Sequence, residues 1–448
     1  LPAWTESRLP LWKVRAALLL YAGLAGFGRE VRGGMLDPRA TLARCPALRA
    51  EGLLGAGLYR DAQVDDARLV LETLKSARRL GAEAVSYAAV EDLMREAGGR
   101  VCGARVRDAR TGRVQRVWAT AVVNAAGPAA GRVLGMARTE PVALRPAKGV
   151  HLVVPRERLP TSCAVTFEAA DGRHLFFVPW DEEVGLVGTT DAFDAEIDEP
   201  VVRIEEVHYL LEAANRAFPR AALTTNDVRC AFAGVRPLVA EQAEGALPPS
   251  SVSREERVEC GPPGLVSVWG GKLTTYRTTA ERVVDRVVAG LPRARRRSLG
   301  RSRTVGLALR EDDFEGDARA EGLSRRYELP RRVTRQLVRA HGPEAEALLA
   351  RAEPDELAPI GRSAFCYAQV AWSLRAECAL GLCDVLERRV RLAVFAPGQG
   401  LGQLERLVTV AARAAGWDDA RARSEAAAYV ASVRRRYQIA SPAAADAA

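Results

Sequence analysis

Residues 267–284 read SVWGGKLTTYRTTAERVV: two glycines and a lysine stand in front of threonines that open an apolar-periodic helix. An apolar segment ends at Gly270 and Gly271, which let the backbone approach a ligand without side-chain obstruction. Lys272 follows on this hinge, and a helix is expected to begin near Leu273–Thr275, where unpaired N–H groups carry a partial positive charge. The pattern is typical of a strand, turn and helix that hold an anionic group. It also fits an ordinary helix start with a solvated lysine.

The start of this helix has a second possible position, because Thr278 and Glu281 fit a capping box. A second glycine-containing turn follows the segment AVVNAAGP, residues 121–128. We expect a buried strand at Ala121–Val123, with small residues after it where a cofactor approaches the carboxyl end of the strand. Taken alone, this segment is more typical of an ordinary strand-to-turn exit.

The chain has 448 residues, more than one ordinary core accommodates, so two or three domains are expected. With 48% hydrophobic and 27% charged residues, its composition is that of a soluble globular protein. The longest apolar run, residues 16–27, is too short to span a bilayer, which takes about 20 residues. It fits a buried or interfacial helix.

Arginine carries almost all of the net charge of +9, and the lysines are Lys13, Lys75, Lys148 and Lys272. Such a bias is more typical of genome composition than of nucleic-acid binding, so no nucleic-acid partner is expected. The eight cysteines form no CxxC pair and the four histidines are scattered. These counts predict reduced core cysteines and no metal site.

Changes of pattern divide the chain. Residues 1–139 contain an amphipathic opening, a helix that begins after QVDD and stops at Gly81, and short strands, which suit an α/β nucleotide-binding layer. Residues 140–260 are short β-branched or aromatic runs with one helix, typical of a mixed-sheet substrate-binding domain. Residues 261–295 return to the α/β layer, residues 300–440 are expected to be helical, and residues 441–448 to be disordered. The longest periodic set in the helical part is Tyr367, Val370, Leu374, Cys378, Leu382 and Leu386.

Cationic and titratable residues recur in the 140–260 segment. Arg236 lies among apolar residues in FAGVRPL, and a buried arginine needs an anionic partner, for which its fork suits a phosphate. Arg254 follows one hairpin later, and Lys148 and His151 stand at the start of a strand. For each of these residues alone, a structural ion pair is the better explanation. Together they favour a pocket for a small phosphorylated substrate.

Seven motifs occur in a fixed order: QVDDARLVLE, VVNAAGP, KGVHLVVPR, FVPW, GLVGTTD, GVRPL and GGKLTTYR. In this combination the chain closely resembles the FAD-dependent, quinone-linked glycerol-3-phosphate dehydrogenases, over about residues 1–440. The resemblance implies a mixed α/β fold of the FAD-binding amino-acid-oxidase type, with two domains and a C-terminal helical domain. It implies oxidation of sn-glycerol 3-phosphate at C2 to dihydroxyacetone phosphate, with hydride transfer to FAD and electrons passed to quinone.

Residue roles follow from the same resemblance. It implies that Arg236 and Arg254 hold the phosphate, that Lys272 and His151 lie near the reacting hydroxyl, and that Thr275 contacts the substrate. The flavin-lining set is Asn124, Ala126, Gly127, Gly270, Gly271, Lys272, Leu273 and Thr274. The proton acceptor stays open. Lys272 is preferred as acid/base or alkoxide stabiliser, because burial beside arginines is expected to lower its pKa.

One departure qualifies the resemblance, because the chain contains no GxGxxG turn. We therefore expect the first βαβ unit of the FAD-binding domain to be missing, and FAD to bind weakly or not at all. Two alternatives remain: a glycerol-3-phosphate oxidase that uses oxygen, and a non-catalytic remnant. The resemblance also implies a cytoplasmic protein, peripheral on the inner membrane, and a possible homodimer. The opening helix around residues 12–27 fits membrane contact and fits packing in a core at least as well.

Overall fold

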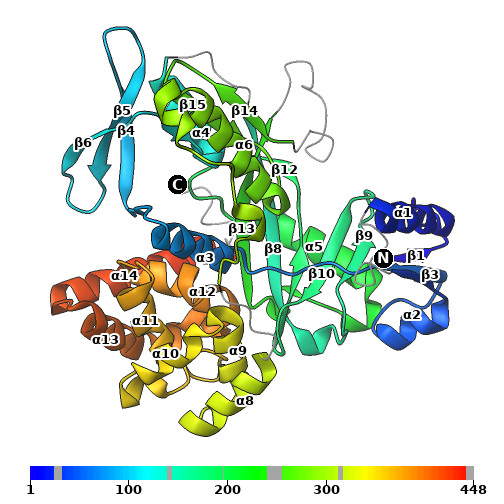
Figure 1. Cartoon of the computed structure of the whole chain (residues 1–448). Coiled ribbons are helices and arrows are strands. Elements are labelled where there is room, and N and C mark those ends of the chain that lie inside the picture. The colour runs from blue at the N-terminus through cyan, green and yellow to red at the C-terminus, as the bar shows by residue number, and fades with distance from the viewer. Residues whose placement is uncertain (25–32, 139–143, 195, 240–254, 311–315, 440–448) are drawn as a thin grey trace.

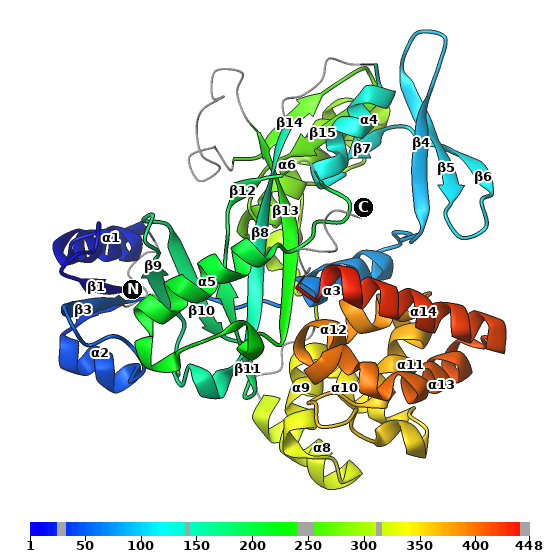
Figure 2. The ribbon, with the colours of Figure 1, turned by 180° about the vertical axis from the view of Figure 1, so that it is seen from behind.

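The computed structural model describes residues 1–24, 33–138, 144–194, 196–239, 255–310 and 316–439. Three regions are visible in Figure 1: a large sheet with an N-terminal unit against it, an α/β layer with a projecting sheet, and a helical domain. Figure 2 shows β8 and β13 running side by side through the middle of the molecule.

The large sheet contains β8 (Leu144–Pro155), β9 (Val165–Glu168), β10 (His174–Pro179), β11 (Val184–Gly188), β12 (Ala192–Phe193) and β13 (Cys230–Val239). The order is β12-β8-β11-β10-β9, and β13 pairs with β8 as well. Helix α5 (Ile204–Ala217) covers one face, because its apolar residues recur at helical spacing. Leu152, Phe177 and Leu210 are fully buried in the shared core.

The N-terminal unit consists of β1 (Pro2–Trp4), α1 (Leu11–Leu24), β2 (Gly34–Leu36), α2 (Pro38–Arg44) and β3 (Leu53–Leu58), with strand order β1-β3-β2. Trp4, Leu48 and Leu53 belong to the same buried core as the large sheet. The described residues of this unit therefore pack on that sheet, whereas the sequence pattern had placed them with the nucleotide-binding layer.

Helix α1 is mostly exposed. Val14 is its buried residue, while Trp12, Leu19, Leu20 and Leu24 face outward. Packing of this helix in a core, one of the two expectations, is therefore not what the described residues show. None of the described helices has the length and apolar character needed to cross a membrane.

The α/β layer contains β7 (Val122–Asn124), β14 (Arg257–Cys260) and β15 (Leu265–Trp269), in the order β14-β15-β7, with β15 parallel to β7. Helices α4 (Ala130–Met136) and α6 (Tyr276–Ala289) belong to it, and β4 (Ala88–Arg95), β5 (Val101–Asp108) and β6 (Val114–Trp118) form the projecting sheet of Figure 1. Strand β7, which the sequence predicted to be buried, is only partly buried. It is an edge strand among the described residues, and Val123 is 43% exposed.

The helical domain contains α8 (Gly316–Tyr327), α9 (Arg331–His341), α10 (Glu344–Ala350), α11 (Tyr367–Ala376), the π-helical η10 (Asp384–Arg389), α12 (Leu392–Phe395), α13 (Leu404–Ala415) and α14 (Asp419–Arg436). The long periodic set from Tyr367 to Leu386 is not one helix. Cys378 has a left-handed φ of 54°, and the chain turns there. Helix α7 (Arg293–Arg297) lies in the connection before this domain. The short helical turns are η2 (Gly127–Ala129), η3 (Arg156–Arg158), η4 (Pro219–Ala221), η5 (Thr225–Asp227), η7 (Leu273–Thr275), η8 (Thr304–Gly306), η9 (Pro354–Leu357) and η11 (Pro397–Gln403).

Helix α3 (Asp66–Arg79) forms where the sequence predicted it, between the N-cap Asp65 and Gly81, whose φ is 93°. Figures 1 and 2 place it between the helical domain and β13. Its buried Arg68 donates to both carboxylate oxygens of Glu377, at 3.0 and 2.9 Å, and to the carbonyl oxygen of Ala340. This contact ties α3 to the helical domain.

Lys148 does not belong to the expected pocket. Its ammonium lies 3.1 Å from carboxylate oxygens of Asp194 and Glu206 and 3.1 Å from the carbonyl oxygen of Val201, and the residue is 1% exposed. Successive side chains of a strand point to opposite faces, so Lys148 and His151, three residues apart, face opposite ways. The expectation that both line one pocket was wrong.

We expect Lys148→Ala to lower the free energy of unfolding by about 3–5 kcal/mol, because two carboxylates lose the buried cation between them. Urea unfolding followed by tryptophan fluorescence measures this loss. Lys13→Ala, at an exposed position, serves as the control and should stay within about 0.5 kcal/mol of the parent. Equal stability of the two variants would contradict a role for Lys148 in the fold.

Candidate active site

A cavity of about 850 Å³ lies where β8, β13, the turn after β15, α3 and the helical domain meet. Six of the residues predicted from sequence line it: His151, Arg236, Gly270, Gly271, Lys272 and Leu273. They come from three separate stretches of the chain, which the β8–β13 pairing and the glycine turn bring together. Arg254 lies outside the described residues.

Arg236 is held from two sides. Its Nη2 donates to Thr189 Oγ1 at 3.1 Å, and its Nη1 lies 3.4 Å from Asp191 Oδ1. The guanidinium lies over Gly149, where a Cβ atom would collide with it. The side chain is 29% exposed. The anionic partner expected for a buried arginine is therefore Asp191 of the GTTD motif, and the guanidinium is fixed at the cavity wall.

His151 lies opposite Phe232 in the β8–β13 register, and the two rings stack with centroids 5.5 Å apart. The backbone of Gly188 passes close to the imidazole and leaves no room for a Cβ atom there. Burial, followed by the charge of Arg236, lowers the pKa of His151 to about 4. The ring is therefore neutral near pH 7 and can accept a proton or a hydrogen bond.

The glycine turn has the geometry expected from the sequence. Gly270 and Gly271 have φ values of 75° and 85°, which glycine adopts readily and other residues rarely do. The helix begins as η7 directly after Lys272 and continues as α6, and no side chain caps its start. Thr278 donates to the carbonyl oxygen of Thr275, so the alternative capping box does not form.

Lys272 stands exposed at the rim of the cavity. The burial that the sequence argument assumed is therefore absent, because the turn directs Lys272 to the open side.

The remaining flavin candidates lie near the cavity without lining it. Asn124 is buried, donates to the carbonyl oxygen of Ala130 at 3.0 Å and accepts from the Ala126 amide at 3.3 Å, so it shapes the turn after β7. Gly127 begins η2, which packs against β13 and β15. Ala126, Gly127, Thr274 and Thr275 are likewise not among the described lining residues.

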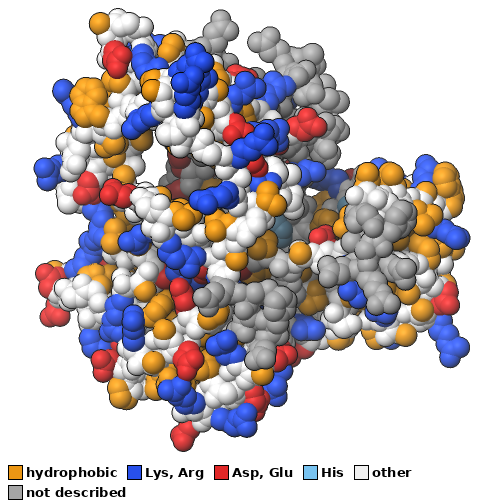
Figure 3. Space-filling model, viewed as in Figure 1, with side chains coloured by type: hydrophobic (Ala, Val, Ile, Leu, Met, Phe, Trp, Pro, Cys, Tyr) orange, Lys and Arg blue, Asp and Glu red, His pale blue; other side chains and the backbone are white. Residues whose placement is uncertain are grey.

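The helical domain supplies a wall that sequence reasoning missed: Glu387, Arg388, Arg391, Val394, Arg436 and Tyr437. Asp66, Ala67 and Val70 of α3 complete it. The five cationic lining residues, Arg236, Lys272, Arg388, Arg391 and Arg436, outnumber the acidic ones, Asp66 and Glu387. The run ERRVR, residues 387–391, was the available signal. Over the whole face shown in Figure 3, by contrast, Lys and Arg side chains are spread out among Asp and Glu.

Comparisons with known proteins agree with this architecture. A family described as FAD dependent oxidoreductase matches residues 2–277, and the C-terminal domain of alpha-glycerophosphate oxidase matches residues 312–422. The aerobic glycerol-3-phosphate dehydrogenase of Staphylococcus aureus (strain USA300) is 33% identical over 380 residues, which cover 83% of this chain and 68% of that protein. The chain belongs to the FAD-dependent glycerol-3-phosphate dehydrogenase family.

A solved relative confirms the fold class predicted from the motifs. The glycerol-3-phosphate dehydrogenase from Bacillus halodurans, crystallised with FAD, superposes with a TM-score of 0.75 at 30% identity. The match covers 90% of this chain and 79% of that one. This member of the family thus has the amino-acid-oxidase-type FAD-binding fold with a helical C-terminal domain, as the resemblance implied.

The glycine turn fits the cofactor of this family. Gly270 and Gly271 present bare backbone to the cavity, and the uncapped start of η7 and α6 offers N–H groups and a positive helix end beside it. A planar group that becomes anionic on reduction is stabilised in such surroundings. Gly270, Gly271 and Leu273 are therefore the described lining residues suited to hold a flavin ring.

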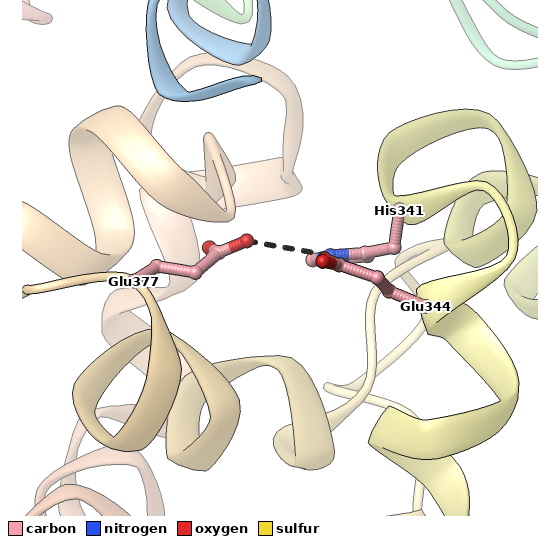
Figure 4. A group of neighbouring side chains, drawn as sticks. All are labelled: His341, Glu344 and Glu377. Atoms are coloured by element: carbon pink, nitrogen blue, oxygen red, sulfur yellow. Dashed lines mark ion pairs between the residues drawn. The ribbon is translucent and has the colours of Figure 1, made fainter. Parts of the chain in front are cut away.

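One cluster has the composition of a metal site. Ligand atoms of His341, Glu344 and Glu377 lie within 4.8 Å of one another, and Figure 4 shows Glu377 facing the other two. The Glu377 carboxylate is already bound by Arg68, and the Lys75 ammonium lies 3.2 Å from it and contacts Glu344 as well. Two cations thus occupy the place of a metal ion, and the cluster is an ion-pair network.

Stability should depend on His151 between pH 6.5 and about 4. In this window the unfolded state binds more protons than the folded state, so stability falls as the pH falls. We expect His151→Gln to reduce the loss of unfolding free energy between about pH 7.5 and about pH 4.5 by about 2 kcal/mol. Urea titrations at both pH values measure this change. His341, whose pKa burial also lowers, is present in both the parent and the variant and so does not affect the difference between them. A variant with the pH dependence of the parent would contradict the prediction.

Proposed function

We propose that this chain oxidises sn-glycerol 3-phosphate at C2 to dihydroxyacetone phosphate with FAD as the hydride acceptor. The observation that carries the proposal is that Arg236 of β13 and His151 of β8 lie on the same face of the sheet, in a cavity that also contains the glycine turn. The names of the relatives from S. aureus and B. halodurans support the same substrate.

Arg236 is the proposed phosphate-binding residue, together with Arg254. Thr189 and Asp191 fix the guanidinium, so little side-chain freedom is lost when a phosphate binds. Arg236 and the exposed Lys272 are the cationic lining residues from the β13 and glycine-turn side, and they favour a substrate that carries a double negative charge. Thr275 stays a proposed substrate contact.

His151 and Lys272 are the proposed acid–base residues. The neutral imidazole of His151 can accept the proton of the C2 hydroxyl, and the Lys272 ammonium can stabilise the developing alkoxide. The cofactor, when bound, would supply the acceptor for the hydride that leaves C2. Asn124, Ala126, Gly127 and Thr274 are proposed to shape the surroundings of the cofactor.

Quinone is the proposed electron acceptor, with oxygen as the second candidate. The exposed apolar side chains of α1, with Lys13 and Arg15 on the same helix, support a peripheral position on the cytoplasmic face of the inner membrane. Comparing re-oxidation of the reduced protein by a soluble quinone and by oxygen separates the two acceptors.

The test is the visible absorption spectrum of the purified chain with added FAD, recorded anaerobically before and after glycerol 3-phosphate. Bound flavin that bleaches with substrate supports the proposal. A chain that retains no flavin, or flavin that glycerol 3-phosphate leaves oxidised, rejects it in favour of a non-catalytic role.

Arg236→Ala should raise the glycerol 3-phosphate concentration for half-maximal bleaching by about 10- to 100-fold, because charge-assisted hydrogen bonds contribute about 1.5–3 kcal/mol. Titration of the flavin band with substrate gives this value. The control Arg105→Ala removes the same charge from an exposed position of β5. It should leave the concentration for half-maximal bleaching unchanged. Equal behaviour of both variants would place the phosphate elsewhere.

Lys272→Met should lower the rate of flavin bleaching at saturating substrate by about 100-fold, because alkoxide stabilisation acts in the transition state. The substrate concentration for half-saturation should change little. Stopped-flow absorption under anaerobic conditions resolves rate from affinity. A variant with the parental rate would remove Lys272 from the chemistry and leave His151 as the acid–base residue.

A further inference from the structure

Arg391 lies where the helical domain meets the cavity. Its backbone has a φ of 63° and a ψ of 23° at the N-cap of α12. A non-glycine residue rarely adopts this left-handed conformation, so its surroundings must hold it there. The side chain is 13% exposed, and its guanidinium lies 5.3 Å from the centroid of the Phe395 ring.

Arg391 bridges two carboxylates at the start of α3. Its Nη1 lies 3.0 Å from Asp65 Oδ1 and 2.9 Å from Asp66 Oδ1. Asp65 is the N-cap of this helix, and its Oδ1 also accepts from the Arg68 amide at 3.2 Å. One cation from the helical domain therefore holds the first turn of α3.

This first turn is part of the cavity wall, because Asp66, Ala67 and Val70 line the same space as His151 and Arg236. The Asp66 side chain is 69% exposed, so water screens its charge, and the Arg391 guanidinium at 2.9 Å compensates for it on the protein side. Burial lowers the pKa of His151 most, Arg236 lowers it further and the Asp66 carboxylate raises it. The charge of Asp66 thus acts inside the cavity.

We propose that Arg391 is a positioning residue of the substrate site: it clamps the first turn of α3 as a cavity wall and neutralises carboxylates that would otherwise repel an anionic substrate. The nature of that substrate rests on the function proposed above. The positioning part rests on the contacts of Arg391 alone.

Affinity tests the neutralising part. Calorimetric titration of the full chain with glycerol 3-phosphate should show about tenfold weaker binding for Arg391→Gln, because a like charge then faces the ligand. Adding Asp66→Asn to that variant should restore most of the affinity. A purely structural role of Arg391 predicts no rescue, and either absence of rescue or unchanged binding by Arg391→Gln overturns the neutralising role.

The matched control is Arg389→Gln, two residues away. Arg389 donates to the carbonyl oxygens of Glu377 and Cys378 and is not among the described lining residues. The Arg389→Gln variant loses the same charge as Arg391→Gln and should bind glycerol 3-phosphate with the affinity of the parent. Asp66→Asn alone keeps the fold testable if Arg391→Gln does not fold. It should bind at least as tightly as the parent, and weaker binding overturns the proposal.

Hydrogen exchange of the ligand-free protein tests the positioning part. The amides of Arg68 and Leu69 donate to Asp65 and should exchange at least about tenfold faster in Arg391→Gln but not in Arg389→Gln. Unchanged exchange overturns the clamp. A parent chain that does not bind glycerol 3-phosphate rejects the proposed function, while exchange still decides whether Arg391 holds α3.

Discussion

The antiparallel pairing of β8 with β13 is the constraint on which the rest depends. The register runs from Leu144 opposite Val239 to Val153 opposite Cys230. On one face it sets His151 beside Phe232 and Arg236 over Gly149, and on the other it buries Lys148 between two carboxylates. A slip of one residue would exchange these faces, so one hydrogen-bond ladder specifies both the candidate site and an internal ion-pair group.

A second constraint joins the layers of the molecule. Arg68 and Lys75 of α3 meet Glu377 of the helical domain in a buried network. Burial of Glu377 raises the pKa of its carboxyl group. The contacts with His341 and Arg68 outweigh this effect and hold the pKa well below its usual range. Because removing charges from water is costly, such a network stabilises little for its size, but its contacts join α3 to the helical domain in a defined geometry. That geometry places Arg391 at the cavity.

Much of this arrangement is local in the sequence and was predictable. Helix α3 follows from its N-cap, apolar spacing and terminal glycine, and the turn at Gly270 and Gly271 follows from the residue types. The opposite orientations of Lys148 and His151 were also available from strand alternation, which the charge argument ignored. The exposure of Lys272 and of Val123 depends instead on turn direction and on strand neighbours, which apolar patterns do not encode. The contribution of Arg391 depends on packing between segments more than 300 residues apart.

The wall of the cavity extends in sequence from Asp66 to Tyr437. During synthesis the ribosome releases the β8–β13 pair and the glycine turn long before α14, so the earlier domains fold while this space is still open to water. The complete wall therefore forms around a ligand only after α14 has docked. A substitution in the helical domain that prevents α14 from docking can for this reason lower catalysis, because the cavity wall is then incomplete.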